Sequence, residues 1–101
     1  MKFLTRELVA DLLNSEMPEL FDTHDVERRV LRKIPIEFVK ELYGYEGKND
    51  PLRQFSMEFA KWIDDVFSPF IQQTGKDTTE NLGGKRSECQ QWRKISSGPI
   101  S

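Results

Sequence analysis

The chain has 101 residues, a mass of 11.9 kDa and a formal net charge of −2 at pH 7. From that length we expect one domain and no second catalytic lobe, because domains most often run to roughly 100 to 150 residues. An isoelectric point near 5.4 argues against a general nucleic-acid binder, for which a value above about 9 is usual. We expect one helical domain over residues 1–95 and a flexible tail over residues 96–101.

Apolar residues recur at helical spacing through the first half of the chain and predict three helices. The first covers about residues 5–16, and the second begins at Asp22 or Thr23, whose side chains can accept hydrogen bonds from free backbone N–H groups. Pro35 then interrupts the pattern and separates a third segment. The three apolar stripes are Leu8, Val9, Leu12 and Leu13; Val26, Val30, Leu31 and Ile34; and Phe38, Val39, Leu42 and Tyr43.

The dipeptide Asp50-Pro51 predicts the start of a fourth helix, because aspartate caps well and proline at the first helical position loses no hydrogen bond. Ser68-Pro69 ends it. This helix has the bulkiest apolar stripe of the chain, which predicts a central position in the core. The stripe consists of Leu52, Phe55, Phe59, Trp62, Ile63, Val66 and Phe67.

The helical period is lost after Phe70, where short extended pieces and turns occur. Gly83-Gly84 can adopt positive φ, which favours a hairpin that joins residues 76–82 to residues 85–94. A capping box that starts at Ser87 favours a short final helix over residues 85–95 instead. The predicted fold class is therefore mainly α: a bundle of three to four helices followed by a short C-terminal β-hairpin or short helix, in the element order of a winged helix.

Residues that could carry chemistry are isolated in this sequence. His24 is the single histidine and Cys89 the single cysteine, and neither lies in a nucleophile motif or a zinc-ligand pattern. The adjacent carboxylates Asp64 and Asp65 point about 100° apart on a helix, which favours a solvated face. We therefore predict no catalytic residue, no cofactor site and no metal site, and a protein that is not an enzyme.

Charge is uneven along the chain. Residues 1–75 hold 10 Lys and Arg against 14 Asp and Glu, whereas residues 76–101 hold 5 against 3. This basic end, with two cations of the fourth helix, is the predicted nucleic-acid contact surface. The contact residues would be Lys76, Lys85, Arg86, Arg93, Lys94, Arg53 and Lys61. Trp92 is the only large aromatic residue after Phe70, and we expect it to anchor this segment to the core.

The sequence also predicts a compartment. Charges at Lys2, Arg6, Glu7 and Asp11 interrupt any apolar region of the secretory kind, and no run approaches the ~18 apolar residues that span a bilayer. A single cysteine cannot form an internal disulfide. We expect a cytoplasmic protein with no membrane partner.

Two short motifs carry a resemblance. FDTHD at residues 21–25 and NLGGKRSECQQWRK at residues 81–94 resemble small uncharacterised bacterial proteins that pair an F-D-x-H-D helix start with a Gly-containing loop and a terminal W-R-K. The resemblance implies a bacterial origin and attaches no activity or functional residue to the chain.

Acidic charge and abundant aromatic residues favour a small regulatory protein that docks on a protein partner, as an accessory subunit or an inhibitor. The alternative is a winged-helix-like DNA-binding regulator that uses the basic C-terminal segment.

Overall fold

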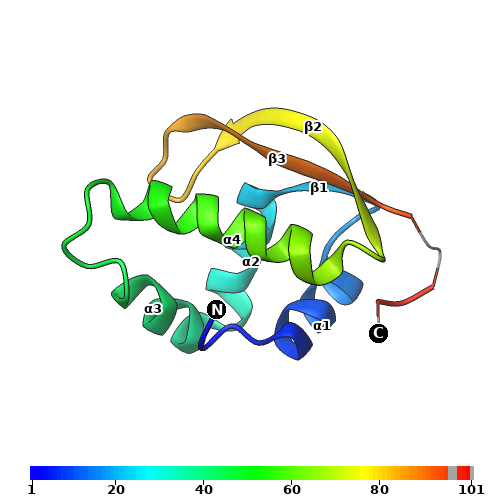
Figure 1. Ribbon diagram of the computed structural model, residues 1–101, viewed down its shortest axis with the longest axis horizontal. Helices are drawn as coiled ribbons and strands as arrows, with labels where there is room; N and C mark the ends of the chain where they lie inside the picture. The colour runs from blue at the N-terminus through cyan, green and yellow to red at the C-terminus, as the bar shows by residue number, and fades with distance from the viewer. Residues whose placement is uncertain (96–97, 101) are drawn as a thin grey trace.

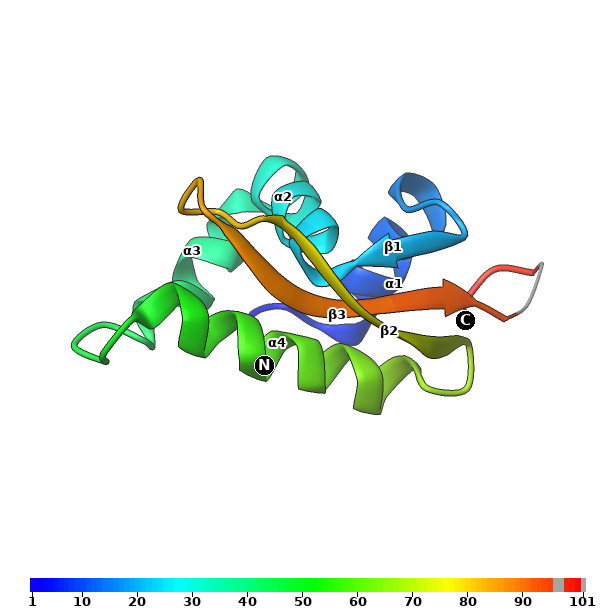
Figure 2. The same ribbon diagram turned by 90° about the horizontal axis from the view of Figure 1, so that it is seen from above.

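The computed structural model describes residues 1–95 and 98–100, which form four helices and three strands. In chain order the elements are α1 (Arg6–Glu16), β1 (Leu20–Asp22), α2 (Thr23–Lys33), α3 (Pro35–Tyr43), α4 (Pro51–Phe67), β2 (Ile71–Glu80) and β3 (Arg86–Lys94). Figure 1 shows the strands together along one side of the molecule, with the helices packed beneath them. Seen from above, α4 runs along one side of β3 and α2 lies on the other (Figure 2).

The predicted fold class, mainly α with a hairpin in a winged-helix-like order, is wrong. The described chain is an α/β fold, 49% helix and 22% strand, with a three-stranded antiparallel sheet in the order β1-β3-β2. The sequence conceals β1 because it has only three residues and directly precedes a helix. It forms because Phe21 and its neighbours pair with β3, with Phe21 opposite Trp92. Long-range pairing therefore creates a strand that local pattern does not indicate.

The β2–β3 hairpin is present, and it begins five residues earlier than the sequence indicates, at Ile71. The competing short helix over residues 85–95 is wrong, because Ser87 pairs with Thr79 in the sheet. Gln73 and Gly75 pair with successive residues of β3, which leaves a bulge between them. At the turn, the side chain of Asn81 accepts hydrogen bonds from the backbone of Gly83 and Lys85.

The helix boundaries largely agree with the local signals. Thr5 caps α1, and Asp22 forms a reciprocal capping box with Asp25 at the start of α2. Helix α4 begins at Pro51 as expected. The prediction that the Asp50 side chain caps this helix is wrong, because Asp50 has φ of 51° and its side chain makes no cap hydrogen bond. Every helix within residues 1–95 and 98–100 is too short or too polar to cross a lipid bilayer.

The core lies between the helices and the inner face of the sheet, and α4 contributes half of its buried aromatic side chains. Phe55 and Phe59 stack with ring centroids 5.2 Å apart, and Phe38 of α3 meets Phe55 edge-on at 5.3 Å. Trp92, the predicted anchor, is fully buried beneath β3. Its ring lies 5.7 Å from that of Phe21, and its Nε1 donates a hydrogen bond to Asp64 of α4 at 3.2 Å.

The predicted tail falls partly outside the described residues, which omit 96, 97 and 101. Ile100 is described and is buried. The Asn14 side chain donates to the Ile100 carbonyl at 2.9 Å and accepts from its N–H at 2.8 Å. This pair of bonds fixes Ile100 against α1.

Candidate functional site

A groove of about 1040 Å³ runs between α4 and the β2–β3 hairpin, and we call it the hairpin groove. Five of the seven predicted contact cations line it. Arg53 and Lys61 come from α4, Lys76 from β2, and Lys85 and Arg86 from the end of the turn and the start of β3. All five side chains are exposed, so the fold gathers on one surface charges that are dispersed over 34 positions of the sequence.

The other two predicted cations are not part of this groove. Lys94 lies at the far end of β3, where its Nζ donates to the carbonyls of Leu13 and Met17 at 2.7 and 2.8 Å. These bonds satisfy carbonyls at the end of α1, and burial lowers the pKa of Lys94. Arg93 pairs in the sheet beside it, about 23 Å along the strand from Arg86 at 3.3 Å per residue. The basic end of the chain is therefore split between two places.

Acidic side chains offset part of the positive charge of the hairpin groove. Asp50, Asp64 and Glu88 line it together with the five cations. Asp64 is half-buried and accepts the indole hydrogen bond of Trp92, so it serves the core as well as the groove. The groove is thus positive in balance but mixed, which weakens its attraction for a polyanion.

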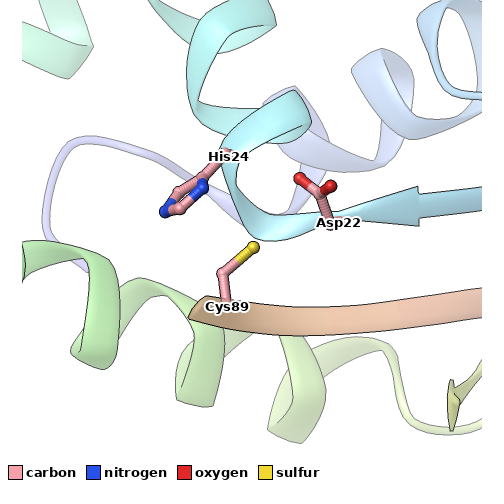
Figure 3. A group of neighbouring side chains, drawn as sticks. All are labelled: Asp22, His24 and Cys89. Atoms are coloured by element: carbon pink, nitrogen blue, oxygen red, sulfur yellow. The ribbon is translucent and has the colours of Figure 1, made fainter. Parts of the chain in front are cut away.

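Three buried side chains with metal-ligating atoms meet at the start of α2. Asp22 is the cap residue of the helix, His24 lies in its first turn, and Cys89 projects from the middle of β3. One ligand atom from each lies within 4.8 Å of the others. Figure 3 shows the sulfur of Cys89 directed toward the start of α2, between the other two side chains. We call these residues the Asp-His-Cys cluster.

The cluster forms part of a hydrogen-bonded network at the wall of the hairpin groove, which His24 and Cys89 both line. His24 Nδ1 lies 2.9 Å from the Thr79 hydroxyl, and that hydroxyl lies 3.7 Å from Cys89 Sγ. Burial lowers the pKa of His24, against the opposing effect of the Asp22 charge. Burial also raises the pKa of the Cys89 thiol, although backbone hydrogen bonding at the start of α2 works in the other direction. Without a further ligand, imidazole and thiol are both favoured in their neutral forms.

A second buried titratable group lies between α2 and α4. Glu27 is fully buried and accepts a hydrogen bond from Ser56, which itself lines the hairpin groove. Burial raises the pKa of Glu27 to about 7, and the Ser56 hydrogen bond offsets only part of that effect. Within the described part of the chain, Oε2 of Glu27 has no hydrogen-bond partner. Near neutral pH this carboxyl group therefore exists in both protonation states.

Sequence spacing does not reveal the Asp-His-Cys cluster. Cys89 lies 65 positions after His24, so no short motif joins them, and Asp22 is identified in the sequence only as a helix cap. The pairing of β1 with β3 brings them together, because Asp22 lies opposite Gln91, two residues beyond Cys89. The cluster could therefore be predicted only if β1 and its pairing with β3 were predicted first.

Three large apolar side chains are exposed on the outward face of α3. Ile36, Val39 and Tyr43 have exposed fractions of 65%, 56% and 73% and share one face at spacings of three and four residues. We call them the α3 stripe. The predicted apolar stripe of this helix is thus divided: Phe38 and Leu42 pack toward the core, whereas Val39 and Tyr43 face outward.

A second groove, of about 930 Å³, continues from the α3 stripe toward α4, and we call it the α3 groove. Val39 and Tyr43 line it together with Phe3 of the N-terminal segment and Trp62 of α4. Glu41 also lines it, and its carboxylate accepts hydrogen bonds from the backbone N–H groups of Phe3 and Leu4. The apolar stripe therefore borders a concave surface in which hydrogen bonds hold the N-terminal segment against α3.

Comparisons with known proteins give no relative for this arrangement: no family model, no curated protein and no solved structure matches the chain. The function of the chain must therefore be inferred from the geometry of its own residues.

Proposed function

We propose that the chain is a small non-enzymatic binding protein that docks on a protein partner through the α3 stripe and the α3 groove. The observation that carries this proposal is the exposure of Ile36, Val39 and Tyr43 on one face of one helix. Isolated exposed apolar residues are normal, but a contiguous apolar surface beside a groove is typical of an interaction site. Tyrosine is also enriched among the residues that dominate binding energy at interfaces.

The abundance of aromatic residues does not itself support docking. Abundant aromatic residues favour docking only where they exceed the needs of the core, and Phe21, Phe38, Phe55, Phe59 and Phe67 are all fully or almost fully buried. These rings are therefore used inside the protein. Support for docking comes instead from the α3 stripe, whose largest members are an isoleucine and a tyrosine.

Charge around the α3 groove indicates the chemistry of its partner. Lys2, Lys40, Lys48 and Lys61 line the groove, against the exposed acids Glu58 and Asp65. Glu41 also lines it but is buried and bound to backbone N–H groups. We infer that the occupant is an amphipathic helix of another protein, with apolar residues toward the stripe and carboxylates toward the lysines.

A paired substitution tests the docking surface. Immobilised wild-type protein and the variants Val39→Ser and Ile95→Ser are compared in capture from a nuclease-treated bacterial lysate. Ile95 is exposed to 53%, close to the 56% of Val39, and lies beyond β3. We expect a protein that Val39→Ser binds at least about tenfold more weakly, as for loss of a central apolar contact, and that Ile95→Ser binds normally.

Zero-length carbodiimide coupling then tests the occupant, because it joins lysines only to carboxylates that touch them. Cross-links from Lys40 or Lys48 to acidic residues of a helical segment are expected. Equal capture by Val39→Ser and wild type would contradict the proposal. So would sedimentation that shows the chain pairing with itself through the α3 stripe.

Nucleic acid is a second candidate partner, favoured by the five cations in the hairpin groove. This alternative rests on those charges alone. Contact through about three or four cations predicts a log-log salt slope near −3 to −4 on duplex DNA. Fluorescence anisotropy on random duplex should then show a flatter slope for Lys85→Glu/Arg86→Glu. Absence of low-salt binding at micromolar protein would remove generic DNA affinity from consideration.

A further inference from the structure

We propose that the Asp-His-Cys cluster binds one divalent transition-metal ion, with zinc as the preferred metal. The proposal rests on three different donor groups, a carboxylate, an imidazole and a thiol, that converge within 4.8 Å from the end of β1, the first turn of α2 and the middle of β3. It is independent of docking at the α3 groove. Figure 3 shows the convergence: Asp22 lies where β1 ends, His24 in the first turn of α2, and the sulfur of Cys89 points toward them from β3.

Burial distinguishes this cluster from an accidental meeting of surface groups. The exposed fractions are 3% for Asp22, 2% for His24 and 8% for Cys89. Acidic and basic side chains are rarely fully buried unless they are paired or bound to a metal. His24 and Cys89 also line the hairpin groove, which gives a metal ion and a water molecule a route to the cluster.

The donor set selects the class of metal. Thiolate and imidazole favour zinc and related ions, whereas magnesium and calcium require oxygen ligands almost throughout. With bonds of about 2.0 to 2.3 Å, tetrahedral zinc needs ligand atoms about 3.5 Å apart. The present spread of up to 4.8 Å must therefore contract by about 1 Å when the ion binds.

The charge of the three ligands favours a divalent ion. One carboxylate and one thiolate supply two negative charges, which neutralise the ion in a buried position. On binding, the Cys89 thiol loses its proton to solvent as the sulfur–metal bond forms. Asp22 is already positioned by its capping box and His24 by Thr79, so two of the three ligands are held before the ion arrives.

Three protein ligands leave the fourth position of a tetrahedral site for water from the hairpin groove. The competing interpretation is a hydrogen-bonded network of His24, Thr79 and Cys89 that binds no metal. The two interpretations differ in a direct measurement, because only the first predicts a sulfur–metal bond.

The test uses purified full-length protein stripped with chelator and then titrated with zinc or cobalt(II) salts. We expect one equivalent of zinc to bind, with a rise in melting temperature, and cobalt to give a sulfur-to-metal charge-transfer band. Cys89→Ser should abolish the band, and Asp22→Asn should weaken binding more than about tenfold. Asparagine caps helices as well as aspartate does, so Asp22→Asn keeps α2 and decides the matter if Cys89→Ser fails to fold.

The matched control is Glu88→Gln, which removes an exposed carboxylate of the same groove, next to Cys89. Its zinc affinity should stay within about twofold of wild type. Absence of the charge-transfer band in folded wild type would overturn the proposal and leave the network interpretation. Zinc binding that Asp22→Asn and Cys89→Ser leave unchanged would overturn it equally.

Discussion

Helices α3 and α4 have similar sequence patterns but differ in how much of their apolar surface is buried. Both begin at a proline and carry apolar residues at helical spacing. In α4, Phe55, Phe59 and Ile63 are completely buried, because the sheet and the other helices cover that face. In α3, Phe38 is buried but the residue beside it, Val39, is more than half exposed.

The difference teaches that periodicity reports an apolar face and does not report what covers it. Helix α4 has 17 residues and lies under the hairpin, whereas α3 has nine and lies at the side of the fold. A short peripheral helix can bury only one narrow stripe. Apolar residues beyond that stripe stay on the surface, where an amphipathic partner can cover them.

The largest expected effect comes from the side chain that joins the sheet to α4. Trp92→Ala should lower the free energy of unfolding by about 5 kcal/mol, because it removes a fully buried ring and its bond to Asp64. Amide exchange over residues 70–95 should accelerate. Protection that survives the substitution would show that the hairpin is held without Trp92.

Phe59→Ala tests the covered face of α4 itself. Removal of the ring that stacks with both Phe55 and Trp62 should lower the free energy of unfolding by about 4 kcal/mol, measured by urea unfolding. A loss below about 1 kcal/mol would mean that α4 is less tightly covered than its burial indicates.

Glu27 gives the contact between α2 and α4 a pH dependence. Its folded-state pKa of about 7 lies above the ordinary value of 4.5, so the stability it contributes is complete below pH 4.5 and is lost as pH rises to about 7. The loss should reach about 3 kcal/mol. Urea unfolding of Glu27→Gln should lack this fall and show a gain over wild type at pH 8. Parallel pH profiles for the two proteins would contradict the raised pKa.

The smallest expected effect on stability is at the α3 stripe. Val39→Ser should change the free energy of unfolding by no more than about 0.5 kcal/mol, since the side chain is already largely in water. Differential scanning calorimetry measures this directly. A loss above about 2 kcal/mol would place Val39 in the core and remove the basis of the proposed docking surface.

Much of the helical part could be predicted from the sequence because its signals are local. Asp22 and Thr5 cap the helices that they precede, and Pro51 starts α4. The strand β1 could not be predicted, because its three residues become a strand only by pairing with residues some 70 positions away.

The same distinction explains the candidate sites. Arg53 and Lys61 are cationic wherever they lie, so the sequence could predict them as candidate contact residues. It could not predict that Lys85 lies in the same groove. The Asp-His-Cys cluster depends on the β1–β3 pairing and escaped prediction with it. Likewise, the division of the α3 apolar residues into buried and exposed halves requires the position of α3 in the fold.

The bulge between Gln73 and Gly75 affects how these molecules behave at high concentration. As an outer strand of the sheet, β2 presents backbone groups along one side that another chain could pair with. Ile71 is the only apolar residue among its ten, the bulge between Gln73 and Gly75 interrupts the regular ladder, and Lys76 adds a charge to the strand. These features oppose the edge-to-edge association through which exposed strands aggregate. The molecule can therefore expose the apolar face of α3 without also exposing a sheet edge that pairs with other copies.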